Sequence, residues 1–176
     1  MRKLSMEELG RISAEEFKQQ KKLPVMVVLD NIRSMMNIGS VFRTSDAFRL
    51  EGICLCGITA IPPNREIHKT ALGATESVDW IFYEKTADAI KSLKKLGYEI
   101  IAIEQTDSSI NLLDFVPQNN TKYAVVFGNE VKGVDDEVLE LCDLCVEIPQ
   151  FGTKHSLNIS VTAGIVIWDF FRKLAV

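Results

Sequence analysis

The chain has 176 residues, of which 47% are hydrophobic and 25% charged, and its formal net charge is −4 at pH 7. This length can bury one full hydrophobic core, and no apolar run reaches the ~20 residues that a membrane span requires. The early acidic residues exclude a secretory signal, which favours a cytoplasmic protein. The negative charge argues against a basic surface over the whole chain, although a local basic patch remains open. Five basic residues gather in one third of the chain: Arg33, Arg43, Arg49, Arg65 and Lys69.

The first half of the chain alternates between helical and strand-like patterns. Residues 5–22 predict a polar helix, because they contain two capping-box patterns of Ser and Glu. Residues 25–29 form a continuous apolar run, which is typical of a strand buried on both faces of a parallel sheet. A helix ending at Phe48, a strand at 53–56, a weakly helical stretch at 64–79 and a short strand at 80–83 are expected to follow.

The second half continues this alternation. Residues 86–96 have the periodicity of an amphipathic helix that ends at Gly97. Strands are expected at 99–103, 123–127 and 144–148, with a loop over 108–120, a short helix at 135–141 and a final helix running toward Lys173. Strands that alternate with helices predict an α/β fold, with a mostly parallel sheet flanked by helices.

The four cysteines are a possible metal site. Cys54 and Cys56 form a C-x-C pair, and Cys142 and Cys145 form a C-x-x-C pair, a combination that can hold zinc or an Fe–S cluster. These residues border or occupy apolar strand-like runs rather than the tight turns of a zinc ribbon, and free cysteine is often buried as a small hydrophobe. We therefore expect no metal site and no disulfide framework.

Polar residues collect where the predicted strands end, and ligands of open α/β sheets gather at the carboxyl ends of strands. The segments concerned are 30–43, 103–107, 127–133 and 148–158. In the third, the glycines of Gly128-Asn129-Glu130-x-x-Gly133 allow a ligand to approach the backbone closely. The chain has neither a P-loop nor a G-x-G-x-x-G fingerprint. A hydrolase triad around Ser156 and His155 is disfavoured because no G-x-S-x-G elbow is present.

The last of these segments leads into the final helix. Pro149 ends the preceding strand because it lacks the N–H of a sheet ladder, and Ser156 or Asn158 can cap the helix. Ser156, Asn158 and Ser160 lie close together, although Ser and Asn compete for backbone hydrogen bonds inside a helix. Both an ordinary helix cap and a ligand site fit this pattern.

Three of the polar segments resemble motifs of the SpoU (TrmH) family of RNA 2′-O-ribose methyltransferases, in the SPOUT superfamily. Asn37–Thr44 resembles the first motif, Val126–Val134 the second and Ile148–Ser160 the third, in the order of the family. Three motifs together are far more specific than one. The resemblance implies a SPOUT domain over residues 24–176 with a C-terminal deep trefoil knot, and residues 1–23 would form an N-terminal helical extension.

The resemblance further implies that S-adenosylmethionine binds in the knot, without a metal. Ile148 and Leu157 beside Gly128 would supply the apolar slot and backbone groups that adenine needs. Many relatives have methionine at the position of Gln150. Carried onto this chain, the cofactor-binding residues are Ile103, Gln105, Phe127, Gly128, Asn129, Ile148, Gln150, Ser156 and Leu157.

The family gives the central catalytic role to the arginine of the first motif, here Arg43. Arginine stays protonated in proteins, so a role as general base is disfavoured. Arg43 would instead clamp the phosphate of the target or stabilise the emerging alkoxide. The residues that would orient Arg43 and the ribose are Asn37, Glu130, Ser156 and Asn158.

RNA is the expected partner, and a compact target such as a tRNA loop is favoured over ribosomal RNA. Lys154, in the positive stretch before Ser156, is placed to contact RNA phosphate. The resemblance also implies a homodimer through the knot region and the final helix, which is apolar on nearly all sides. The alternatives are a non-catalytic RNA-binding protein with the same fold and a SPOUT enzyme that methylates a base nitrogen. The presence of Arg43, Ser156 and Asn158 argues against the non-catalytic protein, and Arg43 in its first-motif setting argues against the base-nitrogen enzyme.

Overall fold

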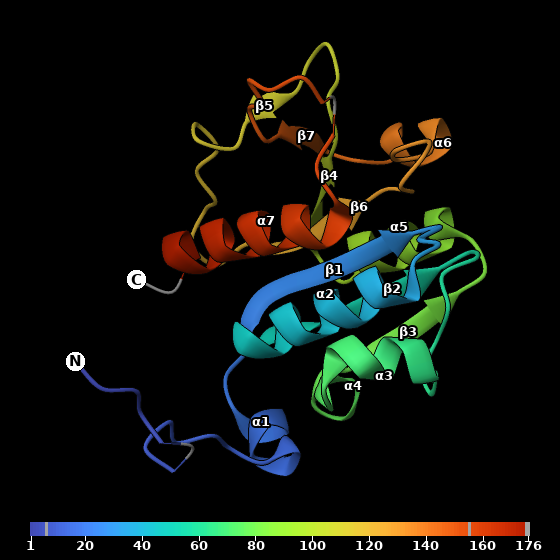
Figure 1. Cartoon of the computed structure of the whole chain (residues 1–176). Helices are drawn as coiled ribbons and strands as arrows, with labels where there is room; N and C mark the ends of the chain where they lie inside the picture. The colour runs from blue at the N-terminus through green and yellow to red at the C-terminus, as the bar shows by residue number, and fades with distance from the viewer. Residues whose placement is uncertain (6, 155, 175–176) are drawn as a thin grey trace.

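The computed structural model describes residues 1–5, 7–154 and 156–174, and its strands form one parallel sheet (Figure 1). In this part of the chain the sheet has seven strands in the order β3-β2-β1-β6-β4-β7-β5, and every neighbouring pair is parallel. The strands are β1 (Leu23–Asp30), β2 (Leu50–Cys56), β3 (Trp80–Tyr83), β4 (Tyr98–Ile103), β5 (Ile110–Asn111), β6 (Lys122–Phe127) and β7 (Leu144–Glu147). The predicted α/β class is confirmed.

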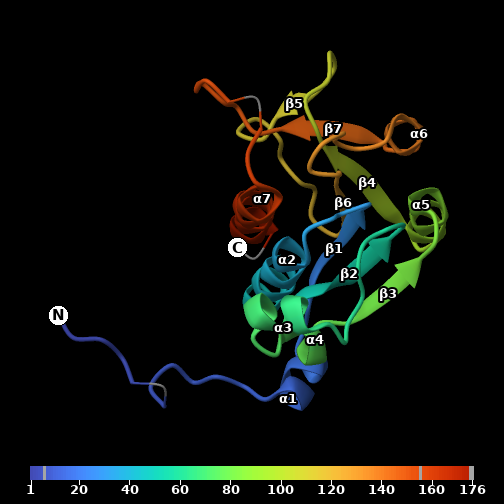
Figure 2. The ribbon, with the colours of Figure 1, turned by 45° about the vertical axis from the view of Figure 1, so that its right-hand side comes forward.

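Helices cover both faces of the sheet, as Figure 2 shows. The helices are α1 (Ala14–Gln19), α2 (Met35–Ala47), α3 (Arg65–Ala71), α4 (Ala74–Ser77), α5 (Thr86–Lys95), α6 (Asp136–Leu139) and α7 (Ile159–Leu174). Helices α2, α3, α4 and α7 lie on one face, and α5 and α6 lie on the other. None of the helices in the described residues is long and apolar enough to cross a membrane.

The alternation of side chains along β1 divides the core into two layers. Val25, Val27 and Leu29 face the layer that contains α2 and α7, whereas Val28 faces the layer that contains α5. All four side chains are fully buried. The prediction of a strand buried on both faces is therefore confirmed for this segment.

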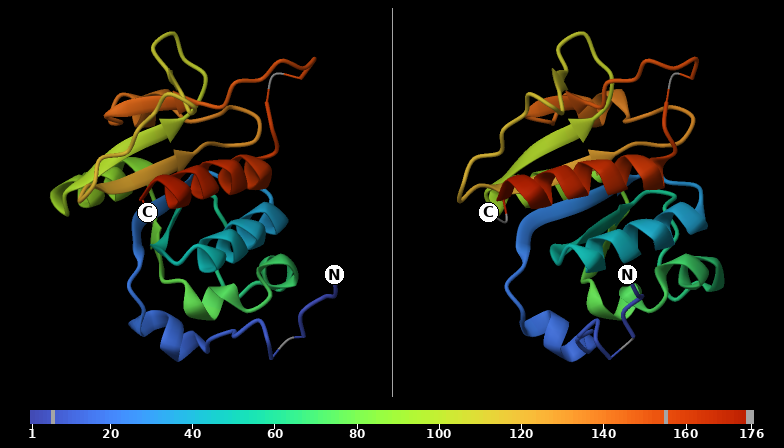
Figure 3. Two further views of the ribbon diagram at one scale, coloured as in Figure 1. Left: turned by 90° about the vertical axis from the view of Figure 1, so that its left-hand side faces the viewer. Right: turned by 60° about the vertical axis from the view of Figure 1, so that its left-hand side comes forward.

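The N-terminal region differs from the helix predicted over residues 5–22, because among the described residues of this range only Ala14–Gln19 is helical. The second capping box forms at Ser13 and Glu16, and Phe17 is buried. Gly10 has a left-handed φ of +56° that interrupts a helix. Residues 1–5 and 7–12 run away from the sheet (Figure 3) and are exposed, so no tertiary packing supports a helix there.

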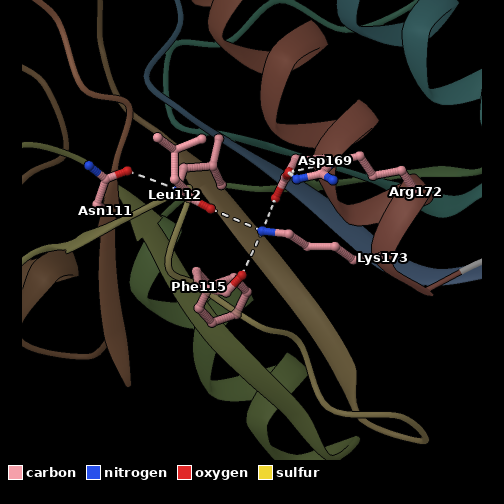
Figure 4. A network of polar contacts seen from close by, with 7 residues as sticks. Asn111, Leu112, Phe115, Asp169, Arg172 and Lys173 are labelled. Carbon is pink, nitrogen blue, oxygen red and sulfur yellow. Dashed lines mark hydrogen bonds and ion pairs between the residues drawn. The ribbon is translucent and has the colours of Figure 1, made fainter.

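The end of α7 is anchored to the segment that joins β5 to β6 (Figure 4). The Lys173 Nζ donates to the carbonyl oxygens of Leu112 and Phe115 at 3.0 and 2.6 Å, and it lies 2.6 Å from the Asp169 carboxylate. The rings of Phe115 and Phe170 are 5.5 Å apart. A partly buried cation thus holds together two segments that lie far apart in the sequence.

The cysteines pack as small hydrophobes. Cys54 and Cys56 are buried on β2, facing the α5 layer, and Cys142 and Cys145 pack against the same layer. Burial raises the pKa of Cys54 and of Cys142 to about 12, so both remain thiols at neutral pH. Among residues 1–5, 7–154 and 156–174, no group of three or more His, Cys, Asp or Glu side chains could hold a metal ion.

Candidate functional site

A cavity of about 780 Å³ opens beyond the carboxyl ends of β4, β6 and β7. Three loops contribute to its walls, through residues 103–106, residues 127–134, and the described residues 147, 148, 150 and 156–159. All nine residues that the family resemblance assigns to the cofactor line this one cavity. Parallel strands end at the same edge of the sheet, which is why segments far apart in sequence meet here.

The loop after β6 is held by the side chain of Asn129. Its Nδ2 donates to the Asn31 carbonyl at 2.6 Å, and its Oδ1 accepts from the backbone N–H groups of Val131 and Lys132. The backbone of Asn129 also exchanges two hydrogen bonds of 2.9 Å with Gly133. The side chain of Asn129 is therefore used within the protein, where it holds the loop in place.

The two glycines of this loop are required by close packing. A Cβ on Gly128 would lie 2.1 Å from the carbonyl carbon of Gly133. Gly133 has a φ of +74°, and a Cβ there would lie 2.3 Å from the Glu104 Oε2. No other residue fits either position without displacing the wall of the cavity.

Glu104 is a wall residue whose side chain received no role in the sequence analysis. Its Oε1 accepts from the Gln105 N–H at 2.9 Å, and its Oε2 accepts from the Val134 N–H at 3.0 Å. The carboxylate thus ties the loop after β4 to the loop after β6. A charged residue directly after the apolar run of β4 was the available sequence signal.

The third loop contributes Ile148, Gln150, Ser156 and Leu157 to the cavity and then starts α7. Asn158 is the helix cap, because its Oδ1 accepts from the Ser160 N–H at 2.8 Å and its carbonyl accepts from the Thr162 N–H. Of the two predicted caps, the structure thus selects Asn158, which also lines the cavity. Lys154 is exposed, and His155 lies outside the described residues.

Glu130 joins the second motif to the first. Its carboxylate accepts from the backbone N–H groups of Arg33 and Ser34, both at 3.0 Å, and from the Asn37 Nδ2 at 3.1 Å. Partial burial by itself raises the pKa of Glu130, but these hydrogen bonds outweigh it and hold the pKa below its ordinary value. Glu130 is therefore an ionised connector at the start of α2, and it also lines the cavity.

Arg43 lies on the exposed side of α2 and does not line the cavity. In the part of the chain that the structure describes, its side chain makes no hydrogen bond and no ion pair. Asn37, six residues earlier, points about 120° away around the helix axis. A single chain therefore brings Glu130, Ser156 and Asn158 to the cavity but leaves Arg43 apart from them.

Gly39 of the first motif marks the crossing of α2 and α3. A Cβ at this position would lie 2.1 Å from the Thr70 Oγ1 and 2.3 Å from the Ile67 carbonyl oxygen. The Thr70 hydroxyl donates to the Met36 carbonyl at 2.9 Å, which fixes the two helices in this close contact. The glycine thus sets the position of α3 against α2.

The parallel sheet and the three-loop cavity at its carboxyl edge place the chain among the SpoU methylases. The sequence model of the SpoU rRNA Methylase family matches residues 24–168, and the chain belongs to this family. It is 33% identical over 150 residues to the 23S rRNA (guanosine-2′-O-)-methyltransferase RlmB of Neisseria meningitidis, covering 85% of this chain and 59% of that protein. It is 30% identical over 157 residues to a putative TrmH family tRNA/rRNA methyltransferase of Staphylococcus saprophyticus, covering 89% and 61%. The chain thus spans about three fifths of the length of these relatives.

Solved structures agree with this assignment. The AdoMet-bound rRNA methyltransferase from Sinorhizobium meliloti matches with a TM-score of 0.79 and 25% identity, over 89% of this chain and 59% of that one. The A. aeolicus TrmH/SpoU tRNA modifying enzyme matches with a TM-score of 0.78 and 24% identity, over 91% and 79%. At 24% identity, the similarity to the A. aeolicus enzyme supports only the fold.

Proposed function

We propose that this chain transfers a methyl group from S-adenosylmethionine to a ribose 2′-hydroxyl of RNA, with tRNA favoured over ribosomal RNA. The observation that carries the proposal is the convergence of nine assigned residues on one cavity of about 780 Å³. This volume lies in the range of about 300–1,000 Å³ that is typical of small-molecule sites. Family membership supports the reaction class.

The residues of the cavity fit the chemistry of S-adenosylmethionine. Apolar side chains of Ile103, Phe127, Ile148 and Leu157 suit the adenine ring, and backbone groups beside Gly128 suit its polar edge. Carboxylates of Glu104, Asp136 and Glu147 also line the cavity and complement the positive sulfonium and amino groups. Gln150, where many relatives have methionine, also lines this cavity.

When bound, S-adenosylmethionine supplies an electrophilic methyl group, so that the S–CH₃ bond breaks as the new O–CH₃ bond forms. The ribose hydroxyl loses its proton to solvent in this step. The Arg43 guanidinium holds the target phosphate or stabilises the alkoxide. Ser156 and Asn158, at the cavity, position the ribose, and Glu130 with Asn37 positions the helix that carries Arg43.

A homodimer would supply the missing part of the site. Val161, Ile165 and Trp168 follow one another at helical spacing along α7, and they are 51%, 39% and 51% exposed. Phe48, at the end of α2, packs its ring 5.6 Å from that of Trp168. We propose that this apolar stripe forms a two-fold interface, across which Arg43 of one copy completes the cavity of the other.

The proposal also includes a trefoil knot in the C-terminal region and the division of the chain into an N-terminal extension and a SPOUT domain. The knot is what the family resemblance implies, and the contacts of Lys173 with Leu112 and Phe115 place the end of α7 beside the segment that joins β5 to β6. Residues 1–23 would then be an N-terminal extension to a SPOUT domain of residues 24–176. Gel filtration with light scattering tests the dimer, and a monomer at micromolar concentration contradicts it.

Calorimetric titration with S-adenosylmethionine is the first test of the proposed function. We expect a single site per chain, and no binding would overturn the proposal. The variant Arg43→Ala then separates the binding of S-adenosylmethionine from the transfer of its methyl group. Lys95→Ala is the control, because it removes one exposed positive charge elsewhere, on α5.

Mapping of 2′-O-methyl positions in cellular RNA, with and without the gene, identifies the target. Loss of a tRNA position supports the favoured substrate, and loss of a ribosomal position selects the alternative. RNA binding without any lost position indicates the non-catalytic protein.

A further inference from the structure

A second cavity, of about 540 Å³, lies between the loop after β2, helices α3 and α4, and the start of β3. It shares no lining residue with the first cavity. Pro63 and Trp80 contribute ring side chains to its lining, and Arg65, His68, Thr75 and Glu76 contribute polar side chains. Nothing in the proposed methyl transfer uses this cavity.

The polar groups of this second cavity are available for a ligand. Arg65, His68 and Glu76 are exposed, and within residues 1–5, 7–154 and 156–174 their side chains make no hydrogen bond or ion pair. The neighbouring Lys69 differs, because its Nζ lies 2.7 Å from the Glu66 carboxylate. Two donor side chains and one acceptor side chain thus line the same cavity as the half-buried Trp80.

We propose that the second cavity binds one unpaired nucleotide of an RNA. The base would stack on Trp80 beside the ring of Pro63, and the phosphate would lie on Arg65 and His68. Unpaired bases are commonly bound by stacking on aromatic rings, with their edges read by hydrogen bonds. The Glu76 carboxylate accepts from an exocyclic amino group, as acidic side chains do with cytosine, so cytosine is favoured over uracil.

The position of this cavity links it to the methylation site. Helix α3 carries Arg65 and His68, and it is locked against α2 at Gly39, where no Cβ would fit. Arg43 lies on α2, so a nucleotide held on α3 fixes the RNA relative to Arg43. The inference rests on the proposed function only in assigning this nucleotide to the RNA that is methylated.

Fluorescence of Trp80 tests the cavity itself. The chain has two tryptophans, so Trp168→Phe leaves Trp80 as the only indole. We expect cytidine 5′-monophosphate to quench this fluorescence with saturation, and to bind more tightly than uridine 5′-monophosphate. Quenching should be absent with inorganic phosphate. Absence of quenching by both nucleotides, or equal quenching by phosphate, overturns the inference.

Surface substitutions test the role of the cavity in RNA binding. The double variant Arg65→Ala/His68→Ala removes exposed side chains outside the core, and Lys95→Ala is the control for lost positive charge. We expect the affinity for unfractionated tRNA to fall at least about tenfold, because the loss of one charge-assisted hydrogen bond weakens binding by about this factor. The affinity for S-adenosylmethionine should stay unchanged.

The two proposals fail separately in these assays. If the wild-type chain does not bind S-adenosylmethionine, the proposed function fails, whereas nucleotide quenching of Trp80 still decides the second cavity. If S-adenosylmethionine binds but the double variant binds tRNA as the control does, the inference about the second cavity is wrong and the proposed function stands.

Discussion

Replacement of Glu130 tests the connection between the loop after β6 and the start of α2. Glu130→Gln keeps the size of the side chain but removes its charge and leaves one acceptor oxygen. In the structure two oxygens serve three donors, on Arg33, Ser34 and Asn37, at 3.0–3.1 Å. Because Glu130 is exposed, each of these charged hydrogen bonds contributes less to stability than a buried one would. The free energy of unfolding should fall by about 1–2 kcal/mol at pH 7.

The pH dependence of this loss identifies its cause. Hydrogen bonding outweighs burial and lowers the pKa of Glu130 in the folded chain. Its charge therefore stabilises the fold above the unfolded pKa of about 4.3, and this contribution is lost as the pH falls through the folded pKa. Urea unfolding should show the full difference between wild type and Glu130→Gln at pH 7 and a much smaller one near pH 3. Glu84→Gln, an exposed acid without a partner in the described residues, is the control. A difference that is constant with pH refutes the reasoning.

The remaining predictions concern catalysis, the α2–α3 crossing and the end of α7. Arg43→Ala should slow methyl transfer to tRNA by about 100-fold or more, without changing the calorimetric affinity for S-adenosylmethionine; an unchanged rate contradicts its role. Gly39→Ala should lower the free energy of unfolding by about 1–3 kcal/mol because its Cβ overlaps α3, whereas Gly164→Ala, with open space around its Cβ, should raise it by about 0.5–1 kcal/mol. Equal urea midpoints for these two variants refute the packing argument. Lys173→Met removes one of the two ion-pair partners of the Asp169 side chain, which is 9% exposed. The free energy of unfolding, measured by thermal unfolding, should fall by about 2–4 kcal/mol. A loss near zero would show that the remaining ion pair with Arg172 is sufficient.

Most of the sheet was predictable because buried parallel strands are continuous apolar runs. This signal located six of the seven strands in the described chain, all except β5. The strand that it missed, β5, has only two residues, and its pairing with β7 through Ile110 and Val146 defines it. Such a strand has no pattern of its own. The N-terminal helix was predicted too long because its capping signals are local, whereas no hydrophobic core lies beside the described residues before Ala14 to stabilise a helix there.

The predicted cofactor residues meet at one cavity, whereas Arg43 and Asn37 do not line it, and the contacts of the individual side chains were not predictable. Strand-end polarity and motif resemblance selected residues that meet at one cavity. The contact between Glu130 and Arg33 joins positions 97 apart, and that between Asn129 and Asn31 joins positions 98 apart. No local periodicity encodes such contacts. The motif glycine Gly39 likewise acquires its reason only when α3 is placed beside it.

The three motifs act on one element, the helix α2 that carries Arg43. Glu130 of the second motif holds the start of this helix, and Gly39 lets α3 lock its middle. Helix α7, capped by Asn158 of the third motif, packs along the same helix. Gly39 and the residues of α3 that it contacts do not line the cavity proposed for S-adenosylmethionine. Substitutions at the crossing of α2 with α3 should therefore displace Arg43 and slow methyl transfer while leaving S-adenosylmethionine affinity intact. A proportional loss of both in Gly39→Ala would show that α2 and the cavity move as one body.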